Sequence, residues 1–219
     1  MQKYILWDLD GTIVNSEDPA FKGHIFETAC RKTGMVFNLS EQQYIGHTGK
    51  EVYKSVLQSN GIYDYANLED GFNIWEDHAV RCLKENIAKV LPRDNVVDLW
   101  NYFHEIGIRQ AVVTSSYEDI AIQYLKNIKI YEKCVSITSL DQVTRPKPDP
   151  EPYQLAMRNL GTEPSFCIAI EDSLSGICSA KSAGIYTIAW LTEGGDHRVE
   201  IADEVTTKLS TEMILKGWL

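Results

Sequence analysis

The stretch KYILWDLDGT, residues 3–12, sets the fold of this chain. Its apolar half, Lys3–Trp7, predicts a short buried strand, and that strand ends in a polar segment with two aspartates and a glycine. In an open parallel sheet, ligands bind beyond the carboxyl ends of the strands. Asp8 and Asp10 are therefore candidate functional residues, provided that further parallel strands lie beside this one.

Two different patterns follow along the chain. Between about Ser16 and Leu91, apolar residues recur every three or four positions, which predicts helices and no strand. From Val96 onward, strand-like runs alternate with amphipathic stretches, which indicates βαβ units. The predicted strands are Gln110–Val113, Val135–Ile137, Phe166–Ile170 and Tyr186–Trp190, and the predicted helices are Val97–Glu105, Glu118–Ile128, Pro152–Leu160 and Ser175–Ala183.

This alternation predicts a three-layer α/β core, in which helices cover both faces of a parallel sheet. The first strand precedes the helical block and the other strands follow it, so we expect the block to be an insertion. Residues 1–14 plus 92–219 are expected to form the core. Residues 15–91 are expected to form the inserted helical domain.

The composition excludes several classes of protein. Hydrophobic residues make up 44% and charged residues 24% of the chain, as in ordinary globular domains. The net charge of −10 would oppose binding to nucleic acid. No apolar run reaches the roughly 18 residues of a membrane helix, and the first residues are expected to lead into a strand rather than to form a signal peptide. The five scattered cysteines show no metal-ligand spacing. We therefore expect reduced thiols in a cytoplasmic monomer without membrane or nucleic-acid partners.

Acidic, hydroxyl and basic residues follow four of the predicted strands. They are Asp8 and Asp10, Thr114-Ser115-Ser116, Arg145-Pro146-Lys147-Pro148, and Glu171-Asp172-Ser173. Several carboxylates together hold a hard cation such as Mg²⁺, while ammonium and hydroxyl groups hold phosphate oxygens. A cation is needed because a carboxylate that approaches a phosphate is repelled by it. Near a protein surface, Coulomb's law gives a repulsion of roughly a few kcal/mol for each pair of charges in contact. The set predicts phosphoryl-transfer chemistry.

Each of these groups alone also fits an ordinary structural role. An aspartate after a strand commonly forms a turn, and Glu171-Asp172-Ser173 or Thr114-Ser115-Ser116 could simply begin a helix. Lys147 could be a solvated loop residue. All four groups occur in order, however, each at a predicted strand end or in the loop after it. This joint pattern favours the functional interpretation.

The residues resemble the haloacid dehalogenase superfamily of aspartate-based phosphotransferases. Four motifs carry the resemblance: D-x-D-G-T at 8–12, the hydroxyl residue Thr114, K-P-x-P-x-x-Y at 147–153, and E-D-S-x-x-G followed by A-G at 171–184. The resemblance spans nearly the whole chain, since residues 15–91 are similar to the helical cap of the phosphoglycolate phosphatase and β-phosphoglucomutase branch. It implies a Rossmann-like α/β core with an inserted α-helical cap.

The resemblance also implies a role for each matching residue. Asp8 would be the nucleophile that forms an aspartyl-phosphate. Asp10 would protonate the leaving alcohol and then activate water. Thr114 would bind the transferring phosphoryl group, with Ser115 beside it as a substrate-binding residue. Lys147 would neutralise the phosphoryl oxygens and the nucleophile.

The resemblance implies Mg²⁺ as the cofactor. The ion would lie between Asp8, the backbone carbonyl of Asp10 and Asp172, with Glu171 as an adjacent ligand candidate. The dehalogenase branch lacks an acid at the position of Asp10 and needs no metal. Asp10 therefore favours phosphate chemistry over carbon–halogen cleavage.

The segment Gly46–Lys50 ends in Gly-Lys, but a P-loop would need a hydroxyl residue where Glu51 stands. The resemblance instead places this loop in the cap, facing the active site. His47, Thr48 and Lys50 are then candidates for substrate binding, and the alternative is a plain turn between helices.

The expected function is an Mg²⁺-dependent phosphatase for a small phosphorylated metabolite, such as a sugar phosphate or phosphoglycolate. The main alternative is a phosphosugar mutase of the β-phosphoglucomutase kind. Those mutases carry a cap histidine where this chain has Ala20, and a cap-loop arginine that Gly46–Lys50 lacks. Both departures favour hydrolysis.

Two non-enzymatic classes remain as alternatives. A receiver-type signalling module gathers the same residue types, but it is shorter, has no cap and carries its phosphoacceptor on an internal strand. A catalytically inactive phosphate-binding protein would have lost at least one motif residue. None is lost here.

Overall fold

The computed structural model describes residues 2–45, 47–192 and 199–218. The chain divides into two compact units, one made of Met1–Asn15 with Leu91–Leu219 and the other of Ser16–Val90. Gly46 of the predicted cap loop lies outside the described residues, as does Gly194-Gly195, which the sequence predicts to be a mobile loop.

The first unit is built on one six-stranded parallel sheet of order β3-β2-β1-β4-β5-β6. The strands are β1 Tyr4–Trp7, β2 Arg109–Val113, β3 Cys134–Thr138, β4 Cys167–Glu171, β5 Tyr186–Trp190 and β6 Glu204–Thr206. β1 is central, and its Trp7 is in register with Val112 of β2 and Ile170 of β4. Parallel strands end at the same edge of a sheet, so the polar residues after β1, β2 and β4 meet there. The predicted parallel sheet is confirmed.

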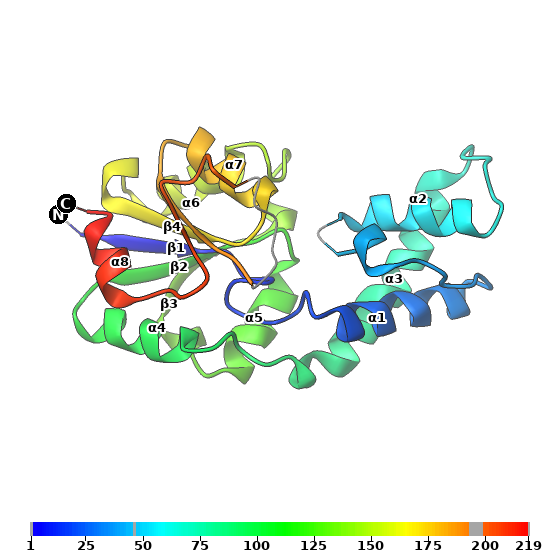
Figure 1. The fold of residues 1–219 in the computed structure, drawn as a ribbon, viewed down its shortest axis with the longest axis horizontal. Helices are drawn as coiled ribbons and strands as arrows, with labels where there is room; N and C mark the ends of the chain where they lie inside the picture. Colours follow the sequence, from blue (N-terminus) through cyan, green and yellow to red (C-terminus); the bar gives the residue numbers. More distant parts are fainter. Residues whose placement is uncertain (1, 46, 193–198, 219) are drawn as a thin grey trace. The chain divides into compact units, whose positions relative to one another are not determined.

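Helices cover both faces of this sheet, with α4 and α5 on one face and α6 and α7 on the other (Figure 1). Their bounds are α4 Val96–Glu105, α5 Glu118–Asn127, α6 Glu151–Leu160, α7 Leu174–Ser182 and, near the end of the chain, α8 Thr211–Lys216. Side chains of β1 alternate between the two faces. Leu6 packs with Tyr153 of α6, whereas Trp7 stacks on Trp100 of α4 with ring centroids 5.8 Å apart. The three-layer α/β core is therefore as predicted.

The second unit is helical and has its own core. It contains α1 Pro19–Lys32, α2 Gly49–Ser59 and α3 Leu68–Asn86. Phe26 of α1 stacks on Trp75 of α3 at 5.3 Å between ring centroids, and Tyr53 of α2 packs on the same indole at 5.6 Å. Stacked and tilted aromatic pairs at these distances are favourable beyond their buried area. That this unit acts as a cap stays a prediction.

Short 3₁₀ turns connect several of these elements. They lie at Glu41–Gln43, Ile87–Lys89, Tyr131–Lys133, Leu140–Gln142 and Pro164–Phe166. Two elements near the end of the chain, β6 and α8, were not expected from the sequence. β6 is a three-residue edge strand and α8 has only six residues, so neither is long enough to show a clear hydrophobic period.

All five cysteines lie within the described residues and none forms a disulfide. Burial raises the pKa of the Cys134 thiol to about 11, which keeps that side chain protonated and unreactive. Among the described residues, no helix has the length and apolar character needed to cross a membrane.

Candidate active site

Asp8 is the first residue after the central strand, and its side chain is fixed by both the sheet and a lysine. Its backbone N–H donates to the carbonyl of Ile170 at 2.9 Å, which continues the β1–β4 pairing by one residue. Its carboxylate accepts a hydrogen bond from Lys147 Nζ at 2.7 Å. The residue is only 7% exposed. Asp8 is therefore a buried carboxylate at the carboxyl end of β1.

Lys147 joins three strand ends through one ammonium group. Besides Asp8, its Nζ donates to the carbonyl of Val113 at the end of β2, at 2.8 Å, and to Glu171 Oε1 at the end of β4, at 2.6 Å. Burial lowers the pKa of Lys147, but the charges of Asp8 and Glu171 raise it by more, so the pKa lies above its ordinary value. The ammonium is permanently charged, and its three donors are all used by the protein.

Glu151 shapes the loop that presents this lysine. Its carboxylate accepts hydrogen bonds from the backbone N–H groups of Thr144 and Arg145, at 2.9 and 3.1 Å, and from Arg145 Nε at 3.1 Å. The Thr144 N–H is the largest cause that lowers the pKa of Glu151, to about 2. These hydrogen bonds hold the loop that precedes α6 against the first residue of that helix.

Glu171 is completely buried and orients Lys147 from the opposite side. Its Oε1 also accepts a hydrogen bond from the Tyr153 hydroxyl at 2.7 Å, while Oε2 is buried and unpaired in the described part of the chain. A side chain at Gly176 would lie about 2.0 Å from Oε2, so α7 can pack here only with glycine at that position. Tyr153 belongs to the predicted motif, but its contact with Glu171 was not foreseen.

Asp172 is held against the loop that follows Asp8. Thr12 Oγ1 donates to Asp172 Oδ1 at 3.2 Å. Gly11 adopts a φ of +80°, and a Cβ there would lie 2.0 Å from Asp172 Oδ2. Glycine is therefore required twice at this position, for the left-handed backbone and for the close approach of the carboxylate.

Asp10 is directed toward the hydroxyl groups after β2. Its Oδ2 accepts a hydrogen bond from Ser116 Oγ at 2.6 Å and from Thr114 Oγ1 at 3.3 Å. Thr114 Oγ1 in turn accepts from the N–H of Ser116 at 2.9 Å. Ser115, predicted to bind substrate, is exposed in the same loop. The contact of Ser116 was missed, because three consecutive hydroxyl residues give no sequence signal for which of them faces the carboxylate.

The electrostatics of this edge favour a cation. Ligand oxygens of Asp8, Glu171 and Asp172 all lie within 4.8 Å of one another. Burial and then the charge of Glu171 raise the pKa of Asp8 well above its ordinary value, although Lys147 acts in the opposite sense. One ammonium thus does not offset the crowded carboxylates. An all-oxygen donor set of this kind is what Mg²⁺ prefers, so the residues present fit a hard divalent cation.

The structure therefore brings together the predicted residues of the core. Asp8, Lys147 and Glu171 are in direct contact, and Asp10 contacts Thr114. The carboxylate of Asp172 joins the three-residue cluster with Asp8 and Glu171.

The predicted substrate-binding residues His47, Thr48 and Lys50 belong to the helical unit. Thr48 is the N-cap of α2 and exchanges hydrogen bonds with Glu51 in a capping box. Lys50 pairs with Glu69, and His47 Nδ1 lies 3.1 Å from the carbonyl of Ile45. Thr48 thus has a structural role within its own unit.

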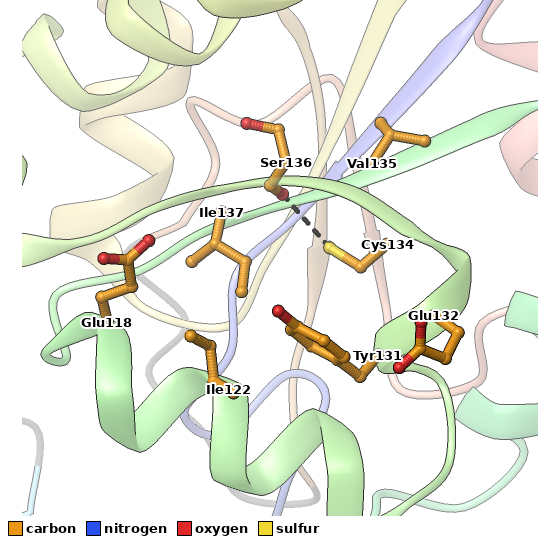
Figure 2. A pocket seen from close by; sticks show the side chains of 8 residues that line it. All are labelled: Glu118, Ile122, Tyr131, Glu132, Cys134, Val135, Ser136 and Ile137. Carbon is orange, nitrogen blue, oxygen red and sulfur yellow. Dashed lines mark hydrogen bonds between the residues drawn. The ribbon is translucent and has the colours of Figure 1, made fainter.

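A separate pocket of about 320 Å³ lies between α5 and β3 (Figure 2). It is lined by Glu118, Ile122, Tyr131, Glu132, Cys134, Val135, Ser136 and Ile137. Cys134 Sγ lies 3.2 Å from the carbonyl of Ser136, the contact marked in Figure 2. None of the residues predicted to be catalytic lines it.

The haloacid dehalogenase-like hydrolase family matches residues 5–190, which is most of the chain. The chain belongs to this family. Among its relatives in that family is the validoxylamine A 7'-phosphate phosphatase of Streptomyces hygroscopicus subsp. limoneus, 29% identical over 96% of this chain and 95% of the relative. Another is the pyrophosphatase PpaX of Halalkalibacterium halodurans, 28% identical over 88% of this chain and 86% of the relative.

The fold is shared with solved structures. The crystal structure of a "predicted phosphoglycolate phosphatase" from Haemophilus somnus superposes with a TM-score of 0.83, at 20% identity and with 98% of each chain covered. At this identity the likeness concerns the fold. As a member of this family, with relatives named phosphatase and pyrophosphatase, the chain is a hydrolase.

Proposed function

We propose that this protein is an Mg²⁺-dependent phosphatase that hydrolyses small phosphate monoesters through a phosphorylated Asp8. The observation that carries the proposal is the arrangement around that residue. Its carboxylate accepts a hydrogen bond from Lys147 at 2.7 Å, lies within 4.8 Å of ligand oxygens of Glu171 and Asp172, and follows the central strand. A second carboxylate, Asp10, is held two residues further on by hydroxyl groups.

The first step is attack by Asp8 on the phosphorus atom. A bond forms between an oxygen of Asp8 and phosphorus, and the bond from phosphorus to the leaving oxygen breaks. Asp10 donates its proton to that leaving oxygen, so that an alcohol departs. The ammonium of Lys147, which is bonded to Asp8, would stabilise the negative charge of the transferring oxygens by its positive charge, and the Thr114 hydroxyl lies beside Asp10.

The second step returns Asp8 to its starting state. Asp10, now ionised, takes a proton from a water molecule that attacks phosphorus, and the bond between phosphorus and Asp8 breaks. Inorganic phosphate leaves. Asp8, the backbone carbonyl of Asp10 and Asp172 would hold Mg²⁺, with Glu171 adjacent, and the bound ion would offset the negative charge that collects on the phosphoryl oxygens.

The substrate class is proposed from the relatives and the helical unit. The relatives are named as a phosphatase of validoxylamine A 7'-phosphate and as a pyrophosphatase, so both names describe hydrolysis at a phosphate group. In this proposal, the core binds the phosphoryl group and the helical unit selects the leaving group. His47 and Lys50 are its candidate selecting residues, and Ser115 is the candidate in the core.

The mutase alternative differs only in where the phosphoryl group goes. A phosphosugar mutase returns it to a second hydroxyl of the sugar rather than to water. Incubation with β-glucose 1-phosphate and a catalytic amount of glucose 1,6-bisphosphate separates the two. We expect free phosphate and no activation by the bisphosphate, whereas rapid formation of glucose 6-phosphate with little free phosphate would support the mutase.

The main experiment is a panel of phosphorylated metabolites, including pyrophosphate, ranked by kcat/KM with and without Mg²⁺. Activity is expected on several monoesters, to be lost on chelation and to return with Mg²⁺. The Asp8→Asn protein is the matched control and is expected to release no phosphate. Full activity in chelator, unchanged by added Mg²⁺, would contradict the proposed site.

A further inference from the structure

Arg93 is a buried cation to which the proposed chemistry gives no role. It is 7% exposed and stands two residues after Leu91, where the chain re-enters the first unit. Its guanidinium carbon lies 3.7 Å from the centroid of the Trp190 ring at the end of β5. Burial lowers the pKa of Arg93, although the charge of Asp172 acts in the opposite sense, and an arginine keeps its charge in proteins.

The guanidinium donates to backbone carbonyls from two different strand ends. Nη1 donates to the carbonyl of Gly11 at 2.8 Å and to that of Trp190 at 2.6 Å, and Nη2 donates to the carbonyl of Leu191 at 3.0 Å. Arginine suits such a site because its planar fork offers several donors in fixed directions and stacks on an aromatic ring. The side chain thus ties the loop after β1 to the loop after β5.

The backbone of Arg93 adds a second connection to the same loop. Its N–H donates to the carbonyl of Ile13 at 2.9 Å, and the neighbouring Pro92 forms an antiparallel bridge with Val14. The N–H of Gly11 donates to the carbonyl of Val14 at 2.8 Å. Residues 11–14 are therefore held by Arg93 and its neighbours from one side.

The peptide group that accepts from Arg93 lies between two proposed contributors to the cation site. The carbonyl of Gly11 follows directly on Asp10, whose own carbonyl is a proposed ligand. The next residue, Thr12, donates to Asp172. A rotation of the Gly11–Thr12 peptide would change both the turn after Asp10 and the support of Asp172.

We propose that Arg93 is a positioning residue for the divalent-cation site: through the Gly11 carbonyl it fixes the loop 10–12 on which the Asp10 carbonyl and the orientation of Asp172 depend. This inference rests on the proposed function, because it assumes a cation held by those groups. Loss of the guanidinium leaves three buried carbonyls short of a donor and frees the loop. The expected result is weaker cation binding rather than a slower chemical step.

The test measures Mn²⁺ binding directly, by the loss of the free-ion signal in electron paramagnetic resonance, on the full chain at a temperature well below unfolding. The variants are Arg93→Lys, which keeps the charge but loses the fork and the stacking, and Arg93→Met, which loses all donors. We expect the Kd for Mn²⁺ to rise at least tenfold in Arg93→Met and by a smaller factor in Arg93→Lys. With enough Mg²⁺, kcat of Arg93→Lys should return to within a few-fold of the parent.

A matched control separates positioning from general destabilisation. Leu125→Ala opens a cavity at a fully buried side chain of α5, which has no part in the proposed cation site, and should lower Tm without changing the Kd for Mn²⁺. An unchanged Kd in both Arg93 variants, or an equal rise in Leu125→Ala, would overturn the inference. If Arg93→Met does not fold, Arg93→Lys decides alone. Asp172→Asn tests the proposed function separately, because Mn²⁺ binding that survives this change would place the cation elsewhere.

Discussion

Lys147 Nζ and Asp8 Oδ1 lie 2.7 Å apart, although the two residues are 139 positions apart in the chain. The side chains are 4% and 9% exposed, so this is a buried ion pair. A second carboxylate, that of Glu171, is fully buried and forms an ion pair with the same ammonium. Removal of the lysine would leave two buried carboxylates without their cation.

Lys147→Met is therefore expected to abolish phosphatase activity and to destabilise the core. Breaking a buried ion pair by removing one partner typically costs about 3–5 kcal/mol of unfolding free energy. Denaturant unfolding in the presence of chelator measures this loss. The control is Lys181→Met, whose pair with Asp203 is about one-third exposed and should contribute less than about 1 kcal/mol. Equal stability losses in the two variants would contradict the buried arrangement.

Asp8→Asn is expected to remove activity and yet raise Tm in chelator. The raised pKa of Asp8 means that the folded protein opposes ionisation of this carboxyl group. A carboxyl group whose pKa is raised on folding stabilises the fold only while it is protonated, and this contribution disappears as the pH rises through its pKa. A neutral amide of the same size avoids that cost at neutral pH, and Lys147 keeps its buried ion pair with Glu171. Turnover should fall on the order of a thousandfold or more, because the nucleophile is lost. A lower Tm, or retained turnover, would argue against the assignment.

Ser116→Ala tests the hydroxyl that donates to Asp10 at 2.6 Å. If Ser116 orients the general acid, kcat should fall about tenfold with alkyl phosphates, a fraction of the 10²–10⁴-fold that general acid–base catalysis typically contributes. An aryl phosphate needs less protonation of its leaving group and should be affected less. Asp10→Asn should show the same dependence on the leaving group with a larger loss. A uniform loss with all leaving groups would assign Ser116 to phosphate binding instead.

Glu151→Gln tests the loop that carries Lys147 through the dependence of stability on pH. The pKa of Glu151 is lowered to about 2 by the N–H groups of Thr144 and Arg145. A carboxyl group whose pKa is lowered on folding stabilises the fold above its unfolded pKa, and loses this contribution as the pH falls toward the folded value. The difference in unfolding free energy between parent and variant should thus be full at pH 6 and shrink from about pH 5 downward. A difference that does not change with pH would contradict the lowered pKa.

The sequence allowed the sheet to be predicted, and it also pointed to most of the residues that the structure brings together at the candidate site. The strand 186–190 was predicted with the bounds that β5 has, and the other predicted strands and helices of the core fall within two residues of their expected ends, whereas β6 and α8 were not predicted. The reason is that parallel strands are buried on both faces and so appear as short apolar runs, each followed by a polar loop. The residues at those strand ends could be selected because the sheet topology brings the ends together.

Side-chain contacts between different strand ends, helices and loops could not be predicted from the sequence. Arg93 is a single arginine in a loop, and nothing in the sequence distinguishes it from a solvated one, since its partners are backbone carbonyls of distant residues. The pairing of Tyr153 with Glu171 and of Ser116 with Asp10 likewise depends on how α6 and the loop after β2 pack on the sheet. Side-chain hydrogen bonds between strand ends carry no periodic signal along the sequence.

The most direct test of the proposed mechanism is to trap the phosphoryl group on Asp8. The protein is mixed with Mg²⁺ and a radiolabelled phosphate monoester, quenched in acid within milliseconds, digested and analysed by mass spectrometry. We expect acid-stable, hydroxylamine-sensitive label on the peptide that contains Asp8, and none in Asp8→Asn. Asp10→Asn should carry more label than the parent if breakdown of the intermediate is slowed more than its formation. Phosphate release by the parent with no label on that peptide at any time would contradict the proposed mechanism.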